Sequence, residues 1–145
     1  YQGGLNEQAI AEYMITHPDQ KRPILNCDPT LAQVAQLRAQ DMADRDYFSH
    51  TNPEGFGPNY LVQQTGYLLP AFYNQALDAN NIETIHGGSS TASGAWTSLM
   101  NSDPHQTHLL GLISFYAEQI DYGIGYAYNP NSTYHHYWVI ITGRH

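Results

Sequence analysis

The spacing of apolar residues changes type once along the chain, near Gly111, and this change constrains the fold more than any other feature of the sequence. Before Gly111 the apolar residues recur at the spacing of amphipathic helices. After it they form dense runs over 120–128 and 134–142, which are typical of strands. The segment 129–132, Asn-Pro-Asn-Ser, indicates an antiparallel hairpin between the two runs. Helices first and sheet last predict an α+β domain.

The clearest helix start is Asp28-Pro29, an N-cap residue followed by proline at the first helical position. Apolar residues then follow at helical spacing as far as Met42, so this helix is expected to run to about Asp46. Further helices are expected over 6–16, 59–65 and 90–101, with a short one between Ser102 and Gly111. The stretch between 66 and 88 is expected to be irregular. Both faces of the last strand are apolar, which predicts a central strand.

Composition limits the class of protein. The chain has 145 residues, enough for one domain covering 1–145. Its 5 Lys and Arg against 13 Asp and Glu give a net charge of −8, which argues against a nucleic-acid partner. The lone Cys27 rules out an internal disulfide framework. The longest apolar runs, such as 137–141, fall far short of the ~20 residues of a spanning helix, so no transmembrane segment is predicted.

The surface is expected to be polar rather than charged, because charged residues make up only 12% of the chain. With Lys21 as the single lysine, this profile favours an extracellular or cell-surface protein over a cytosolic one. No signal peptide is recognisable, and the start at Tyr1 predicts that any targeting segment has been removed.

Five blocks of the sequence, in order, resemble the CAP superfamily of cysteine-rich secretory, antigen 5 and pathogenesis-related 1 proteins, in its disulfide-free bacterial form. Together they cover most of the chain from Leu31 to Ile141. The blocks are the helix 31–46 leading into Tyr-Phe-Ser-His at 47–50, the loop 49–55, Asn-Asn-Ile at 80–82, the segment 99–105, and the closing strands with Tyr122-Gly123-Ile124-Gly125 and Tyr137-Trp138-Val139.

This resemblance implies a three-layer α-β-α sandwich with a central antiparallel sheet, and a cleft. Two His and two Glu line the cleft in the family and in some members hold a divalent metal. The two His correspond to His50 and His105. The two Glu do not carry over, because Asn80 stands at the position of one and Leu99 lies near the other.

A zinc or other divalent metal ion is therefore one hypothesis, with His50 and His105 as ligands. Two imidazoles are fewer than the three protein ligands that an open zinc site normally has. Glu83 is the candidate third ligand, and His86 or His108 could also approach. The alternative is that the two imidazoles hold the loops of a polar cleft together through hydrogen bonds.

Other side chains are candidates for contacting a ligand in the cleft. These are Asn80, His108, Tyr73 and Tyr134, the two tyrosines because they offer flat apolar area with a polar tip near loop ends. His17, His86 and His145 are interpreted as solvated loop residues. Neither a G-x-S-x-G nor an H-E-x-x-H motif occurs, so no hydrolase signature supports a catalytic assignment.

Three functions remain open. The first is a secreted or surface CAP-type binding module whose cleft takes a small apolar or cell-envelope ligand such as a lipid, sterol, glycan or peptide. The second is a weak metal-dependent hydrolase acting on a peptide or ester, with Glu83 completing the metal site or serving as base. The third is an interaction or structural domain without catalysis.

Overall fold

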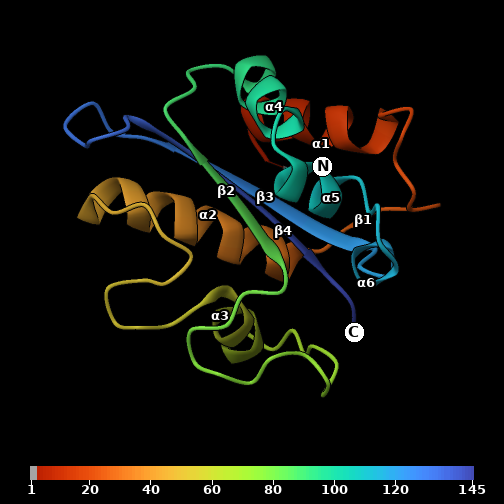
Figure 1. Ribbon diagram of the computed structural model, residues 1–145. Helices are drawn as coiled ribbons and strands as arrows, with labels where there is room; N and C mark the ends of the chain where they lie inside the picture. The colour runs from red at the N-terminus through yellow and green to blue at the C-terminus, as the bar shows by residue number, and fades with distance from the viewer. Residues whose placement is uncertain (1–2) are drawn as a thin grey trace.

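The structure, a computed structural model, describes residues 3–145. Figure 1 shows the helices packed on both sides of one twisted sheet. In chain order the elements are α1 (Leu5–Thr16), β1 (Asn26–Cys27), α2 (Pro29–Arg45), α3 (Pro58–Gln64), β2 (Glu83–Gly87), α4 (Ala92–Met100), α5 (Asp103–Leu109), α6 (Ser114–Ala117), β3 (Asp121–Tyr128) and β4 (His136–Gly143).

The strands lie in the order β1-β3-β4-β2, so β4 is central and β2 forms one edge. β4 pairs antiparallel with both neighbours, as the hairpin prediction requires. The two-residue β1 is the exception, because it pairs parallel with β3. α2 covers one face, and α1, α4 and α5 cover the other (Figure 1). The α+β class and the α-β-α sandwich are thus confirmed.

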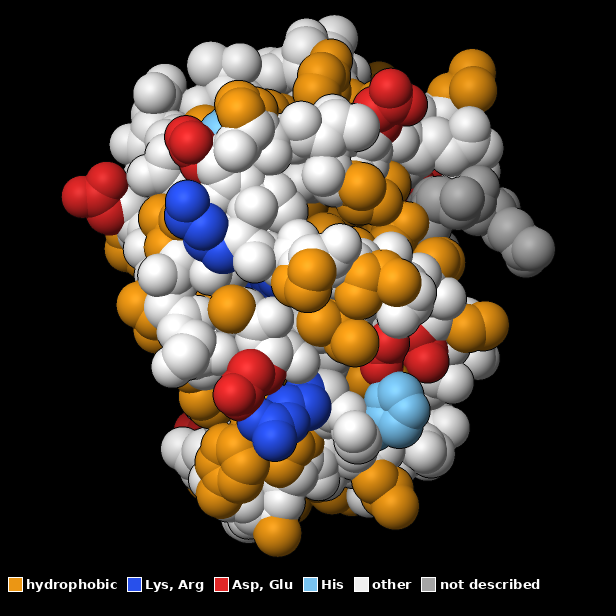
Figure 2. Space-filling model, turned by 90° about the vertical axis from the view of Figure 1, so that its right-hand side faces the viewer, with side chains coloured by type: hydrophobic (Ala, Val, Ile, Leu, Met, Phe, Trp, Pro, Cys, Tyr) orange, Lys and Arg blue, Asp and Glu red, His pale blue; other side chains and the backbone are white. Residues whose placement is uncertain are grey.

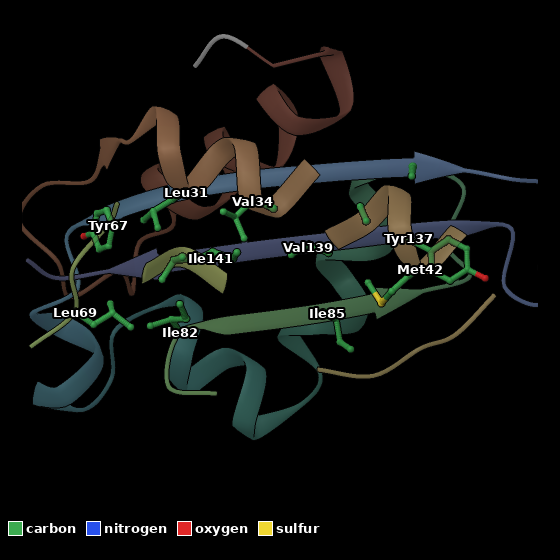
Figure 3. Packing of buried hydrophobic residues seen from close by; sticks show 14 of the residues in the cluster. Leu31, Val34, Met42, Tyr67, Leu69, Ile82, Ile85, Tyr137, Val139 and Ile141 are labelled. Atoms are coloured by element: carbon green, nitrogen blue, oxygen red, sulfur yellow. The ribbon is translucent and has the colours of Figure 1, made fainter. Parts of the chain in front are cut away.

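Two cores result, one on each face of the sheet. Tyr137, Val139 and Ile141 of β4 pack under α2 (Figure 3), whereas Trp138 and Ile140 pack against the other helical layer. Successive side chains of a strand point to opposite faces, so a central strand covered on both sides must be apolar throughout. The dense apolar pattern of the last strand has this physical cause.

Helix α2 begins where the sequence predicts. The Asp28 carboxylate accepts hydrogen bonds from the backbone N–H groups of Thr30 and Leu31, at 2.8 and 3.0 Å, and so caps the helix. Gly125 of β3 lets this helix lie close to the sheet, because a Cβ there would overlap the backbone of Ala35. Asp28 thus sets where α2 begins, and Gly125 allows the helix to approach the strands closely.

The structure differs from the prediction in the segment expected to be irregular. Strand β2 lies there, and the short elements β1 and α6 were not predicted either. The residues of β2, Glu-Thr-Ile-His-Gly, have no clear strand pattern of their own. They form a strand because their backbone pairs with β4 over Glu83–Gly87, which is a tertiary effect that local spacing does not encode.

Charged side chains are sparse on the molecular surface. On the face shown in Figure 2 the Lys and Arg side chains lie close to acidic ones and do not gather into a patch of one sign. Among residues 3–145, no helix is long and apolar enough to cross a membrane.

Candidate functional site

An open groove of about 460 Å³ lies between the edge strand β2 and the loop that follows α2. Three separate parts of the chain and the β3–β4 hairpin supply its walls. The lining residues are Phe48, Ser49, His50, Ile85, His86, Gly87, His105 and Tyr134. The structure therefore brings His50, His105 and Tyr134, all singled out from the sequence, to one surface feature.

A buried ion pair lies beneath the groove. The Glu83 side chain is fully buried, and its two oxygens accept hydrogen bonds from Arg38 Nε at 2.9 Å and Arg38 Nη2 at 3.0 Å. Arg38 also donates from Nη2 to the backbone oxygen of Ser49 at 2.7 Å and from Nη1 to the Tyr47 hydroxyl at 2.9 Å. Burial lowers the pKa of the Arg38 guanidinium, but the attraction of Glu83, its hydrogen bond and smaller contributions from Tyr47 and Asp41 together raise that pKa above its ordinary value. One guanidinium thus ties α2, β2 and the loop together.

Glu83 also orients His50. The Nδ1 atom of His50 lies 2.8 Å from Glu83 Oε1, while 40% of the His50 side chain is exposed. A carboxylate can only accept a hydrogen bond, so Nδ1 carries the proton and donates it to Glu83. In the neutral form of the ring, Nε2 is therefore unprotonated and available to accept a hydrogen bond or to bind a metal.

Asn80 supports this arrangement from the side. Its Oδ1 accepts from the backbone N–H of Ile82 and of Glu83, at 3.0 and 2.8 Å, which fixes the orientation of the amide. Its Nδ2 lies 3.1 Å from the Glu83 carbonyl oxygen and 3.2 Å from His50 Nδ1. Because the proton on Nδ1 is directed at Glu83, the Asn80 amide donates to the Glu83 carbonyl. Asn80 is a positioning residue for the Glu83–His50 pair.

Two further imidazoles are half-buried in the groove. Burial, with a smaller contribution from His50, lowers the pKa of His105. Burial, with a smaller contribution from His105, lowers the pKa of His86, whose Nε2 lies 2.7 Å from Ser89 Oγ. His86 was interpreted from the sequence as a solvated loop residue. It lies on the unpredicted strand β2, so only knowledge of that strand could have placed it here.

His108 lies deeper, with full burial. Thr84 Oγ1 and Thr142 Oγ1 are hydrogen-bonded to its two ring nitrogens, at 2.6 and 2.7 Å. Burial is the main cause that lowers its pKa to about 3, so the ring is neutral. His108 joins α5 to the two strands and has no nitrogen left for a ligand.

A small cavity of about 190 Å³ continues from the groove toward His108, and Asn80, Glu83 and His105 line it with His50. Among residues 3–145, no three His, Cys, Asp or Glu side chains are arranged to hold a metal ion. Glu83 does not complete such a set, because its oxygens are hydrogen-bonded to Arg38 and His50. The residues present do not fit a three-ligand metal site, and binding by the two imidazoles alone stays a prediction.

Of the two tyrosines assigned to the cleft, only Tyr134 lines the groove. Tyr134 is 44% exposed, and its ring lies 5.1 Å from that of Phe48, centroid to centroid. Tyr73 is buried in the core under α2, with its hydroxyl accepting from Gln119 Nε2 at 3.0 Å. The assignment of Tyr73 to the cleft is therefore corrected. Its place near a loop end is shared with Tyr134, so sequence position could not separate the two.

Fold and groove define a class of protein: a three-layer α-β-α domain with histidines from separate segments at one edge of its sheet. The family model of the cysteine-rich secretory protein family, CAP, matches residues 18–142, and the chain belongs to this family. The resemblance found from the sequence blocks is thereby confirmed. No curated protein matches the chain.

Two solved structures have the same fold. One is an extracellular protein containing an SCP domain from Bacillus anthracis, with 24% identity and a TM-score of 0.70 over 97% of this chain and 40% of that one. The other is an outer surface protein from Borrelia burgdorferi, with 18% identity and a TM-score of 0.68 over 93% of this chain and 88% of that one. The chain thus spans well under half of the Bacillus protein.

Proposed function

We propose that this chain is an extracellular or cell-surface binding module whose ligand occupies the groove between β2 and the loop 48–50. The observation that carries the proposal is the meeting of His50, His105 and Tyr134 at one open groove. The names of the Bacillus and Borrelia structures support the location, since one is an extracellular protein and the other an outer surface protein.

The chemistry of the lining supports a ligand that is apolar in one part and polar in another. Phe48 and Tyr134 offer aromatic surface, and three imidazoles offer hydrogen bonds. None of the described residues lining the groove is Lys, Arg, Asp or Glu. Recognition there does not rest on a fixed charge, which favours a neutral ligand.

The test is a titration of the isotope-labelled chain, followed by NMR, with one probe from each class: a neutral lipid, a sterol, a cell-wall glycan fragment and a peptide. The proposal expects one class to shift resonances of the groove residues in a saturable way. Tyr134→Ala is expected to weaken that binding at least ~10-fold, the scale of an interface hot spot.

Tyr128→Ala is the matched control. Tyr128 is an exposed tyrosine at the end of β3, and it does not line the groove. Equal losses of affinity in Tyr134→Ala and Tyr128→Ala would refute the proposal. Saturable resonance shifts confined to residues outside the groove would also refute it. A chain that responds to no class of probe would favour the third hypothesis, a structural or interaction domain.

Hydrolysis is a second candidate, and one observation favours it. The Glu83–His50 pair has the form of a carboxylate that orients an imidazole, as in sites where the imidazole accepts a proton. Calorimetry with Zn²⁺ tests the metal-dependent version. Equal heats for wild type and for His50→Ala with His105→Ala would exclude it, and loss of binding in the variant would support it.

A further inference from the structure

Strand β2 has a free edge that faces the groove. In an antiparallel pair, alternate residues direct both backbone groups to the neighbouring strand, and the residues between them direct theirs away. Gly88 N–H donates to His136 O and Ile82 O accepts from Thr142 N–H, so the even-numbered residues of β2 pair with β4. The backbone N–H and C=O groups of the odd-numbered residues therefore point outward.

One of the three outward residues is already satisfied. The Asn80 side chain accepts from Glu83 N–H and donates to Glu83 O, as a neighbouring strand would. Among the described residues, no hydrogen-bond partner occupies the N–H or the C=O of Ile85 or of Gly87. Both residues line the groove. β2 is the last strand in the order β1-β3-β4-β2, and Figure 3 shows it at the margin of the sheet.

We propose that the ligand of this groove is an extended peptide segment of another protein, which pairs with β2 at Ile85 and Gly87 as an added strand. The backbones of these two outward residues supply two N–H donors and two C=O acceptors. Their two-residue spacing along β2 matches the spacing of the backbone groups of an extended peptide. A lipid or sterol would leave these four groups without partners, at a cost in free energy. This inference rests on the proposed function and specifies its ligand class.

Side chains of the groove would contact the peptide side chains on both faces of the added strand. Phe48 and Tyr134 lie against the Cα of Gly87, where an added Cβ would come within 3.2 Å of each ring. His86 lies on the opposite face of β2, the face of Thr84 and His108, and it interacts electrostatically with His105. The expected peptide has a bulky apolar residue next to a residue with a hydrogen-bonding side chain.

The experiment uses the full chain and a phage-displayed library of short linear peptides. A selected peptide is synthesised, and each of its amides is N-methylated in turn. Methylation at positions that face β2 should weaken binding at least ~10-fold, by loss of a hydrogen bond and by steric clash, and alternate positions should change it less than ~3-fold. On binding, the amide protons of Ile85 and Gly87 should become protected from exchange, whereas Thr84 and His86 are protected throughout.

The outcomes separate this inference from the proposed function. Losses of affinity at alternate methylated positions, together with new exchange protection of the Ile85 and Gly87 amides, support the added strand. Losses of affinity that do not alternate along the peptide overturn the added strand, as do resonance shifts of groove residues without new exchange protection. Either result leaves the proposed binding module unaffected. A library that yields no peptide whose binding Tyr134→Ala weakens also overturns the inference. A saturable response to a neutral lipid or a glycan would then still support the proposed function.

Discussion

Replacing Glu83 by glutamine perturbs the site at its buried centre. The glutamine side chain keeps the shape of Glu83 but carries no charge. Its amide nitrogen must face a donor of Arg38 whichever oxygen it replaces, because Arg38 donates to both. Arg38 would then keep a guanidinium whose side chain is only 2% exposed, without its partner. Breaking a buried ion pair on one side costs ~3–5 kcal/mol, because an uncompensated charge stays buried.

The assay is urea unfolding followed by tryptophan fluorescence, together with a thermal melt. A loss of ~3 kcal/mol predicts a melting temperature lower by roughly 10 °C for a chain of this size. Glu54→Gln is the matched control, since Glu54 also pairs with an arginine, Arg45, but its side chain is 51% exposed. The control should lose much less stability than Glu83→Gln, because water screens an exposed ion pair.

A second change checks the physical cause. If the loss comes from the unpaired charge, adding Arg38→Met to Glu83→Gln should restore part of the stability, because both side chains of the former pair are then neutral. Equal unfolding free energies for Glu83→Gln and Glu54→Gln would refute the reasoning. A double variant less stable than Glu83→Gln alone would contradict the assigned cause.

Three further outcomes are expected. The pKa of His108 is lowered from 6.5 to about 3 in the folded chain. Its contribution to stability is therefore full above pH 6.5 and is lost as the pH falls toward 3. Urea midpoints over that pH range should fall less steeply in His108→Gln than in wild type. Asp28→Ala removes the cap of α2 and should cost ~1 kcal/mol in urea unfolding, with a loss below ~0.3 kcal/mol contradicting the cap. Gly125→Ala should lower the melting temperature by more than Asp28→Ala does, because the new Cβ overlaps the Ala35 backbone, and an unchanged melt would show that α2 can move away.

The sequence predicted the parts of the fold that local rules determine. The cap at Asp28, the helical spacing after it and the apolar pattern of the last strand each have a cause within a few residues, and α2 and β4 lie where expected. Strand β2 has no such local cause. It forms because its backbone pairs with β4. Because β2 was not predicted, the place of His86 in the groove was not predicted either.

The same distinction applies to the site. His50 and His105 could be singled out because each lies in a sequence block shared with a known family. The role of Glu83 could not be deduced, since its partner Arg38 looks like one more polar residue on α2 and only the structure brings the two together. Tyr73 and Tyr134 have similar sequence surroundings, and tertiary packing alone decides that one is buried.

The most direct test of this account is the tautomer of His50, measured from two-bond ¹H–¹⁵N correlations of the labelled imidazole in its neutral form. The account predicts a proton on Nδ1, directed at Glu83, and an unprotonated Nε2 facing the groove, with the preference weakened in Glu83→Gln. A proton on Nε2 in the wild type would contradict it, because Glu83 would then not orient the imidazole toward a ligand.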